Sequence, residues 1–368
     1  MAGIKEVAAK AGVSISTVSY VMSGKRSIGD DTKRKVIEAA RELGYRPKHA
    51  DSSIMSVLEG TPARTPSSVD ASADGNGVGN KVLGRPRTRV LALSSPVHEY
   101  TDYTNYAVFF FSLAGRAKRY GYDILLLMHE YGDQELVRVA RNGMVDGILL
   151  LDVLMEDSRA EIASMLDVPV VSVGYPANTE SVYSVDLDFE RMGREAVERI
   201  AALGHTHVVI VGTNNFAYED GSNYLIRFRD AAVKRGADLG IQVGFVASTG
   251  YGIADVRLML DAVFANDPQV TALICQTNAT HVNNLLLVLR ERGLRVPQDI
   301  SVVGACTQGL QQLPQGVDEM PMEPHAVCSR AIDIMMEILD GKRSDAGSVE
   351  LLPGRYIAHG TLGPCRSK

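Results

Sequence analysis

Apolar residues recur at helical spacing in three short stretches within the first fifty residues. Each stretch repeats its hydrophobic side chains every three or four positions, which is the spacing of one helix face. Gly12 lies between the first two stretches and suits a tight turn, and Ser14 is a good N-cap for the second stretch. The pattern predicts three short helices, the first two forming a helix-turn-helix. The apolar positions are Ile4, Val7, Ala8, Ala11, Val18, Val21, Met22, Val36, Ala39, Ala40 and Leu43.

The pattern changes at residue 89, where short β-branched and leucine-rich runs begin to alternate with amphipathic stretches. Continuous apolar runs separated by helices indicate buried parallel strands in βαβ units. The units are too many for one small sheet, so we expect two doubly wound parallel-sheet subdomains with a ligand cleft between them. The expected strands are Val90–Ser94, Asp123–Met128, Gly147–Leu151, Pro169–Val173, Val208–Gly212, Val243–Ala247, Thr271–Cys275 and Ile300–Gly304. The expected helices include Leu113–Arg119, Phe189–Leu203, Ile226–Arg235 and Val282–Arg292.

Between these regions, residues 61–80 are rich in threonine, proline, serine and glycine and poor in large apolar side chains. Such a stretch cannot offset its ordering entropy, so we expect it to be flexible. We therefore divide the chain into a helix-turn-helix head with a candidate hinge helix (1–58), a linker insertion (59–88) and a core (89–368). Within the core, we assign 89–187 with 320–340 to one subdomain and 188–319 with 341–365 to the other.

Charge is distributed unevenly along the chain. The net charge is −6, yet the first fifty residues hold ten lysine and arginine residues against five acidic ones, a balance of +5. The rest of the chain therefore carries −11. A small basic head on an acidic body indicates that the head alone meets a polyanion such as nucleic acid. A basic, solvated surface without a partner is the alternative reading of the charge alone.

Several protein classes are excluded by the composition. No apolar run approaches the roughly 18 residues that cross a bilayer, and the first twenty residues lack the apolar segment of a signal peptide. The four cysteines are scattered without a C-x-x-C motif, which favours free thiols in a reducing cytoplasm over a disulfide or zinc framework. We expect a cytoplasmic protein with no membrane partner, metal or cofactor.

Catalytic groupings are weak in this sequence. Asp186 and Asp188 form a carboxylate pair, but no histidine or third acid stands at matching spacing, so we expect a structural role for them. Cys306 ends an expected strand but has no basic neighbour in sequence that would activate a thiol. We therefore expect a protein that is not an enzyme.

Two motifs carry a family resemblance. Residues 4–24 read IKEVAAKAGVSISTVSYVMSG, and residues 32–47 continue as TKRKVIEAARELGYRP. These motifs resemble the head of the lactose-repressor (LacI/GalR) family of transcriptional regulators. Further landmarks of that family follow in order at Val145–Leu149, Val168–Val171, Leu203–His205 and Val296–Gly304, so the resemblance covers nearly the whole chain.

The resemblance implies a three-helix head and a periplasmic-binding-protein-like core. It also implies a homodimer that binds a palindromic double-stranded DNA operator. Members of this family commonly repress genes of carbohydrate uptake or use, and a small carbohydrate-derived effector in the cleft modulates their affinity for DNA. A core that senses a nucleoside, an aryl compound or no ligand is the alternative.

The resemblance assigns DNA contacts to the second helix and its flanks. Ile15, Ser16, Thr17 and Tyr20 are expected to reach bases, and Tyr20 stands where many relatives have an arginine. Phosphate contacts are expected from Ser14, Ser19, Ser23, Lys25 and Thr32, with Ile54 wedged into the minor groove. Capping of the helix is the alternative role of Ser14 and Thr17, and Ser14 is expected to serve both roles.

The charged sugar clamps of the family are replaced in this chain. Gly174, Tyr224, Thr277 and Cys306 stand at positions where relatives carry charged or more polar groups. The remaining candidates for effector contacts are neutral or aromatic, with two acids beside them, and an aromatic ring suits stacking on a sugar or a nucleobase. About half of these aromatics are alternatively core residues. The effector candidates are Tyr103, Tyr106, Phe109, Asp152, Phe216, Asp220, Tyr224, Tyr251, Thr277, Cys306 and His325.

Overall fold

The computed structural model describes residues 4–15, 17–18, 21, 30–43, 87–96, 103–129, 132–314 and 316–365. The chain divides into two compact units, Met1–Asp74 and Gly75–Lys368. The predicted hinge helix and residues 59–86 of the predicted linker lie outside the described residues. Among the described helices, none is both long and apolar enough to cross a membrane.

The first unit contains helices α1 (Ile4–Ala11) and α3 (Asp30–Glu42), and residues 15, 17, 18 and 21 between them are also helical. Their apolar faces meet in a small core, as the helical spacing predicts. Gly12 turns the chain after α1 with φ of 65°. The core residues are Val7, Ala8, Val18, Val21, Val36, Ala39 and Ala40.

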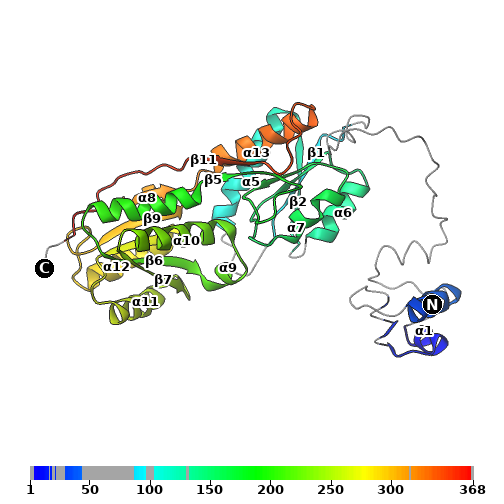
Figure 1. Cartoon of the computed structure of the whole chain (residues 1–368), viewed down its shortest axis with the longest axis horizontal. Coiled ribbons are helices and arrows are strands. Elements are labelled where there is room, and N and C mark those ends of the chain that lie inside the picture. The colour runs from blue at the N-terminus through cyan, green and yellow to red at the C-terminus, as the bar shows by residue number, and fades with distance from the viewer. Residues whose placement is uncertain are drawn as a thin grey trace. The chain divides into compact units, whose positions relative to one another are not determined.

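Two parallel sheets form the second unit (Figure 1). The first sheet has the order β11-β5-β4-β3-β1-β2, and the second has the order β10-β9-β8-β6-β7. Every strand pair in both sheets is parallel. The strands of the first sheet are β1 (Val90–Ser94), β2 (Asp123–Leu127), β3 (Gly147–Leu150), β4 (Val170–Val173), β5 (Tyr183–Leu187) and β11 (Val349–Leu352). Those of the second are β6 (His207–Asn214), β7 (Gln242–Ser248), β8 (Ala272–Gln276), β9 (Ser301–Thr307) and β10 (Asp318–Pro321).

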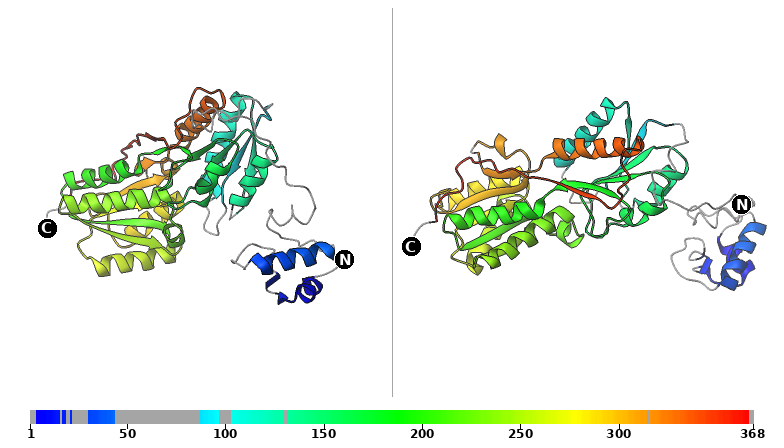
Figure 2. Two further views of the ribbon diagram at one scale, coloured as in Figure 1. Left: turned by 45° about the vertical axis from the view of Figure 1, so that its right-hand side comes forward. Right: turned by 45° about the horizontal axis from the view of Figure 1, so that its top comes forward.

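Helices cover both faces of each sheet, as a doubly wound fold requires (Figure 2). In the first subdomain, α5 (Tyr103–Arg119) and α13 (Pro324–Leu339) pack side by side on one face, and α6 (Asp133–Arg141) and α7 (Ser158–Glu161) cover the other. In the second, α8 (Phe189–Ala202) and α10 (Asn223–Asp238) share one face, and α11 (Ile253–Asn266) and α12 (Ala279–Glu291) the other. The short α9 (Asn215–Glu219) follows β6.

The chain crosses between the subdomains three times, after β5, after β10 and after β11. The third crossing differs from our division of the core, which assigned 341–365 to the second subdomain. Within that segment, β11 pairs with β5 of the first sheet, and only the residues after it return to the second sheet, where Ile357 bridges Glu319. At the other end, Arg87 and Thr88 of the predicted linker already bond to the core, at Asp340 and Asp146.

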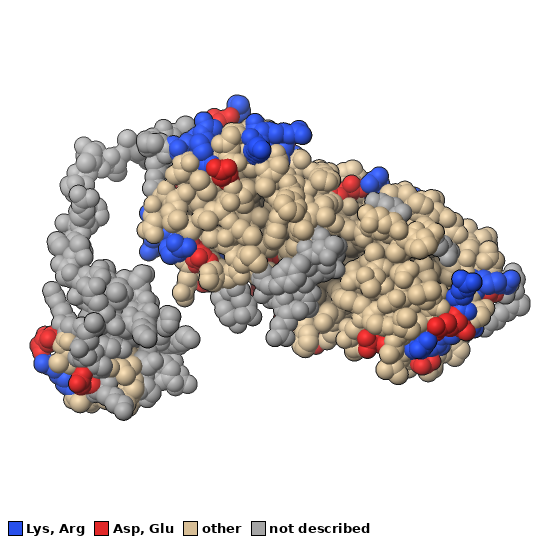
Figure 3. All heavy atoms as spheres, turned by 180° about the vertical axis from the view of Figure 1, so that it is seen from behind, with Lys and Arg blue, Asp and Glu red and all other residues tan. Residues whose placement is uncertain are grey.

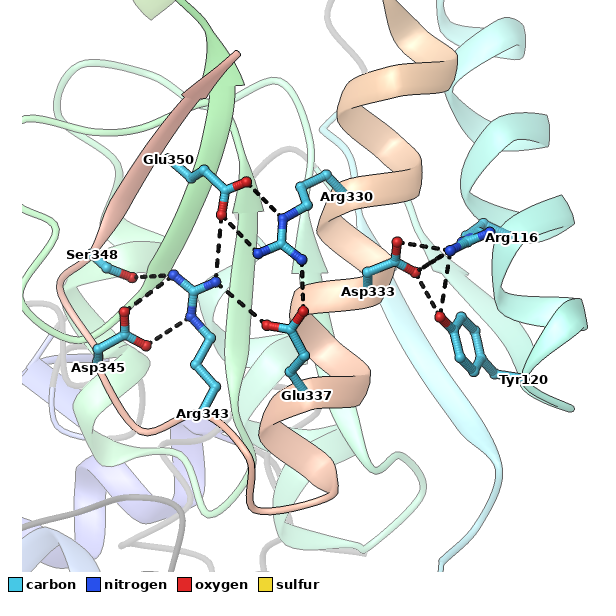
Figure 4. A network of polar contacts seen from close by, with 9 residues as sticks. All are labelled: Arg116, Tyr120, Arg330, Asp333, Glu337, Arg343, Asp345, Ser348 and Glu350. Atoms are coloured by element: carbon cyan, nitrogen blue, oxygen red, sulfur yellow. Dashed lines mark hydrogen bonds and ion pairs between the residues drawn. The ribbon is translucent and has the colours of Figure 1, made fainter.

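An ion-pair network fastens β11 to α13 (Figure 4). The Arg330 guanidinium on α13 donates to both carboxylate oxygens of Glu350 on β11, at 2.6 and 2.9 Å, and to Glu337 at 2.7 Å. Arg343 extends the network to Asp345. On the opposite side of α13, Asp333 accepts hydrogen bonds from Arg116 of α5. These bidentate pairs hold α13 to β11 on one side and to α5 on the other.

Candidate functional site

A cavity of about 140 Å³ lies at the carboxyl ends of the strands, with lining residues from both subdomains. This is where open parallel sheets bind ligands. Its size leaves room for on the order of ten water molecules, close to the size of one sugar ring or one nucleobase. Lining residues follow β3 at Asp152, lie within β5 at Asp186, end β6 at Thr213 and follow β8 at Thr277.

Aromatic rings provide much of the apolar lining. Tyr106 and Phe109 come from α5, Tyr224 from α10, and Tyr251 from the loop before α11. The rings of Phe189 and Tyr224 pack against each other with centroids 5.4 Å apart. Flat apolar faces beside a few polar groups are typical of small-molecule sites.

A first group of polar lining residues has hydrogen-bond partners within the protein; we call Thr213, Tyr251, Gln276 and Thr277 the paired side. The hydroxyls of Tyr251 and Thr213 lie 2.6 Å apart, and the Thr277 hydroxyl lies 3.0 Å from His281 Nδ1. Gln276 accepts from the Tyr218 hydroxyl at 2.8 Å and donates to the Leu225 carbonyl at 3.2 Å. These side chains are held in place before any ligand arrives.

Asp152, Asp186 and Asn223 form a second group of polar lining residues, which we call the acceptor side. Asp186 is 6% exposed and its Oδ1 accepts from the Leu187 amide at 2.9 Å. Asn223 is 2% exposed, and its amide nitrogen donates to the Val153 carbonyl. Among the described residues, no hydrogen-bond donor reaches Asp186 Oδ2 or Asn223 Oδ1. Buried acceptors without partners are uncommon and call for a ligand or a water.

Burial determines the protonation of Asp186. Desolvation raises the pKa of its carboxyl to about 8, although the Leu187 amide and the more distant Arg227 charge both act to lower it. A carboxyl that is neutral at pH 7 in the empty site and ionises when an opposite charge arrives is a feature of functional sites.

Two lining residues have a left-handed backbone that is uncommon outside glycine. Asp152 has φ of 55° and Cys306 has φ of 54°. Strained residues of this kind cluster at ligand sites, where the surrounding structure holds them. Asp152 is held through its carbonyl, which accepts from the buried Arg159 guanidinium at 3.1 Å. Arg159 also donates hydrogen bonds to the carbonyls of Ser94 and Leu151, so this one side chain connects the ends of β1 and β3.

Gly174 occupies a position in the lining that leaves no room for a side chain. Its φ is 103°, a conformation that side chains rarely adopt, and a Cβ there would lie 2.9 Å from the Asn223 amide nitrogen. The amide of Asn223 therefore occupies the space that a side chain at position 174 would need.

The cavity brings together seven of the eleven predicted effector residues: Tyr106, Phe109, Asp152, Tyr224, Tyr251, Thr277 and Cys306. The exposed Phe216 and Asp220 lie on and after α9, outside the lining, and His325 on α13 instead lies 2.8 Å from the Ser112 hydroxyl through its Nδ1. Tyr103 begins α5, and its side chain lies outside the described atoms. Whether these residues contact an effector stays a prediction.

Sequence reasoning missed Asp186 and Asn223 as lining residues. The available signal was the carboxylate of Asp186 within an otherwise apolar and small-residue stretch, Val182–Leu187. Asn223 carried no local signal, because it reaches the cavity through its bond to Val153 on the first subdomain. The four cysteines are free thiols, as the sequence predicts.

In the head, the described residues place Ser14 at the start of the second helix. Its hydroxyl oxygen accepts from the Thr17 amide at 3.1 Å, which confirms the capping role. Ile15 is 45% exposed, a large share for an apolar side chain in a helical core. Thr32 is half-buried on α3. The predicted contacts Ser16, Ser19, Tyr20, Ser23, Lys25 and Ile54 lie outside the described residues.

On the face shown in Figure 3, basic and acidic residues of the core lie in small mixed groups separated by wide uncharged surface. Such a face offers no continuous basic track for a nucleic acid backbone.

Comparison with known proteins gives matches in both units. Residues 3–48 match the model described as bacterial regulatory proteins, lacI family, and residues 197–362 match the periplasmic binding protein-like domain. The chain is 24% identical to the HTH-type transcriptional repressor PurR of Vibrio cholerae over 358 residues, which cover 96% of each chain.

Two solved structures share the fold. One is a transcriptional regulator CelR–cellobiose complex, with a TM-score of 0.62, 19% identity and coverage of 98% of this chain and 100% of that one. The other is the lac repressor dimer bound to operator and an anti-inducer, with a TM-score of 0.61, 19% identity and coverage of 98% and 99%. The chain therefore combines a LacI-type helix-turn-helix domain with a periplasmic-binding-protein-like domain, and its relatives over nearly the full length are transcriptional regulators.

Proposed function

We propose that this protein is a dimeric repressor that binds a palindromic operator and changes its affinity when a carbohydrate-derived molecule occupies the cavity. The observation that carries the proposal is the combination, in one chain, of a family-matched head with a preformed cavity at the strand ends. Two heads related by a two-fold axis read two half-sites about 10 base pairs apart, which makes the operator an inverted repeat.

In this proposal, the second helix of the head enters the major groove. Ile15 packs on a thymine methyl, an assignment supported by its 45% exposure. Ser14 holds the helix start and contacts a phosphate, which positions the head without reading sequence. Ser16, Thr17 and Tyr20 then read bases.

The proposed dimer contact lies on the first subdomain. Phe111 on α5 is 77% exposed, and Leu126 on the edge strand β2 and Met128 after it are 40% and 44% exposed. Ile124 packs with the α5 side of the sheet, and strand alternation places Leu126 on that same side. Large exposed apolar side chains on the neighbouring elements α5 and β2 favour a second copy of the chain as their cover.

The chemistry of the cavity supports a hydroxyl-rich effector. Aromatic rings suit the apolar faces of a sugar, and the oxygens of Asp186 and Asn223 that have no described partner can form hydrogen bonds with its hydroxyl groups. A related structure holds cellobiose, which we take as support for a carbohydrate in this fold.

Affinity selection of random duplexes by the full-length protein tests this function. We expect an inverted repeat of about 20 base pairs whose affinity falls steeply with salt, because phosphate contacts release counterions. Phe111→Glu should lower the oligomeric mass measured by light scattering from two chains to one and weaken operator binding.

Leu258→Glu on α11 is the matched control, since Leu258 is 70% exposed on the other subdomain. It should leave the dimer and its operator affinity unchanged. Selection of no sequence, or a Phe111→Glu dimer with full operator affinity, would contradict the proposal.

A further inference from the structure

The lining of the cavity has an unusual balance of hydrogen-bonding groups. Asp186 Oδ2 and Asn223 Oδ1 are both buried oxygens that no described hydrogen-bonding group reaches. On the paired side, by contrast, Thr213, Gln276 and Thr277 already have partners within the protein. A ligand that fills this cavity therefore has to bring hydrogen-bonding partners to both oxygens, because a buried polar atom left unpartnered costs about 1–3 kcal/mol.

The charge of the lining further narrows the chemical class of the ligand. Among the described residues, the lining contains the carboxylates of Asp152 and Asp186 and no lysine, arginine or histidine. Arg227 is the cation whose charge lowers the pKa of Asp186. Its guanidinium, however, lies 3.2 Å from Glu190 and stacks 3.6 Å above the centre of the Tyr175 ring. The other titratable groups near Asp186 are the Cys306 thiol and the Tyr175 phenol, which are neutral at pH 7.

We propose that the effector is a hydroxylated amine, such as an amino sugar, whose ammonium group binds Asp186 and whose hydroxyl donates to Asn223. The proposal rests on the proposed effector function of the cavity and names the ligand class. It makes Asp186 a specificity-determining residue. The aromatic lining then packs on the carbon skeleton of the same ligand.

Other ligand classes fit the lining less well. A phosphorylated sugar or a carboxylate ligand would place an anion beside the carboxyl groups of Asp152 and Asp186, and the described lining holds no cation to receive it. A neutral sugar supplies hydroxyl groups to Asp186 and Asn223 but forms no hydrogen bond between charged partners. An ammonium group favours the ionised form of Asp186 and donates to it, and hydrogen bonds of this kind are about twice as strong as neutral ones.

Proton release gives an independent readout. The buried Asp186 carboxyl, with a pKa of about 8, is mostly protonated at pH 7 in the empty cavity. Pairing with an ammonium group favours the ionised form and lowers this pKa, so binding should release close to one proton. A neutral sugar should release none.

The experiment is titration calorimetry of the full-length protein at pH 7, in two buffers of different ionisation enthalpy. The probes are three matched sets. The first contains glucosamine, galactosamine and mannosamine, and the second contains the corresponding sugars with a hydroxyl in place of the amine. The third contains the 6-phosphates of those hydroxyl sugars. We expect at least one amine to bind at least tenfold more tightly than its hydroxyl counterpart, with proton release, and the phosphates to bind most weakly.

Asp186→Asn should remove both the tenfold preference and the proton release. Asp188→Asn is the matched control: Asp188 caps α8 by accepting from the Arg191 amide, and asparagine caps a helix equally well. It lies two positions from Asp186 and outside the lining, so amine binding should be unchanged.

Each result decides the proposal. A neutral or phosphorylated sugar that binds as tightly as its amine overturns it, as does a panel in which no amine binds or an Asp186→Asn variant that keeps the preference. In the first case, a bound sugar that alters operator affinity would leave the proposed function standing. Failure of the operator selection would instead remove the proposed function itself.

Discussion

The two sides of the cavity differ in how their polar groups are satisfied. On the paired side, each hydroxyl or amide group has a partner within the protein, as Tyr251 has in Thr213. On the acceptor side, Asp186 and Asn223 keep one oxygen each without a described partner. We therefore propose that the paired side gives the cavity its shape and that Asp186 and Asn223 select the hydrogen-bonding chemistry of a ligand.

Support beneath the acceptor side explains how it stays open. Arg159 and Asp157 are 3% and 4% exposed and pair at 2.7 Å. The Arg159 guanidinium also holds the carbonyls of Ser94, Leu151 and Asp152. These bonds hold the ends of β1 and β3 in place beside the cavity.

The largest expected effect comes from breaking these bonds with Arg159→Met. The change leaves the buried Asp157 carboxylate without its cationic partner and removes the hydrogen bonds to three carbonyl groups. We therefore expect a loss of about 3–5 kcal/mol in the free energy of unfolding. Urea denaturation measures it. Arg138→Met is the control, because Arg138 pairs with Glu135 at the surface with 51% of its side chain exposed, and it should cost under about 1 kcal/mol. Equal losses of unfolding free energy for the two variants would show that Arg159 does not hold the strand ends beside the cavity.

A smaller effect, the pH dependence of the free energy of unfolding, distinguishes Asp186 on the acceptor side from the residues of the paired side. The folded protein holds the Asp186 proton with a pKa of about 8, whereas the unfolded chain releases it near 3.8. The folded state therefore binds more protons between these values, and its stability falls as pH rises through that window, by up to about 1.4 kcal/mol per pH unit. Asp186→Asn should remove this slope in urea denaturation between pH 5 and 7.5.

Tyr251→Phe on the paired side is the matched comparison. It deletes one hydrogen bond and should cost about 1 kcal/mol at every pH in this range. If Asp186→Asn keeps the slope of the unchanged protein, as Tyr251→Phe should, the account of Asp186 as a buried proton-holding group is wrong.

The fold was readable from sequence wherever burial follows hydrophobicity. All eight expected strands are present, and the helical spacing of the head located its core, including Val7 and Val36. Strands β5 and β10 escaped notice because they bury polar residues. In β10, Asp318 is 3% exposed and is satisfied by the amides of residues 359–361, which are distant in sequence. Such pairing leaves no local pattern.

The candidate site was readable only in part, for the same physical reason. Residue type and strand-end position indicated Tyr106, Asp152 and Cys306, because aromatic and polar groups at the ends of parallel strands point to a ligand. We interpreted Asp186 as structural, because the sequence does not show which groups surround its carboxyl and leave one oxygen without a partner. Asn223 reaches the cavity through a contact between subdomains, which no sequence window contains.

The most direct test of the account joins the two units of the chain: operator affinity of the full-length protein at pH 7, with and without the amine that binds best. If occupancy of the cavity controls the head, saturating amine should change the operator dissociation constant at least tenfold, and the matched neutral sugar at the same concentration should not. An operator affinity that stays the same while the cavity is saturated would contradict the account.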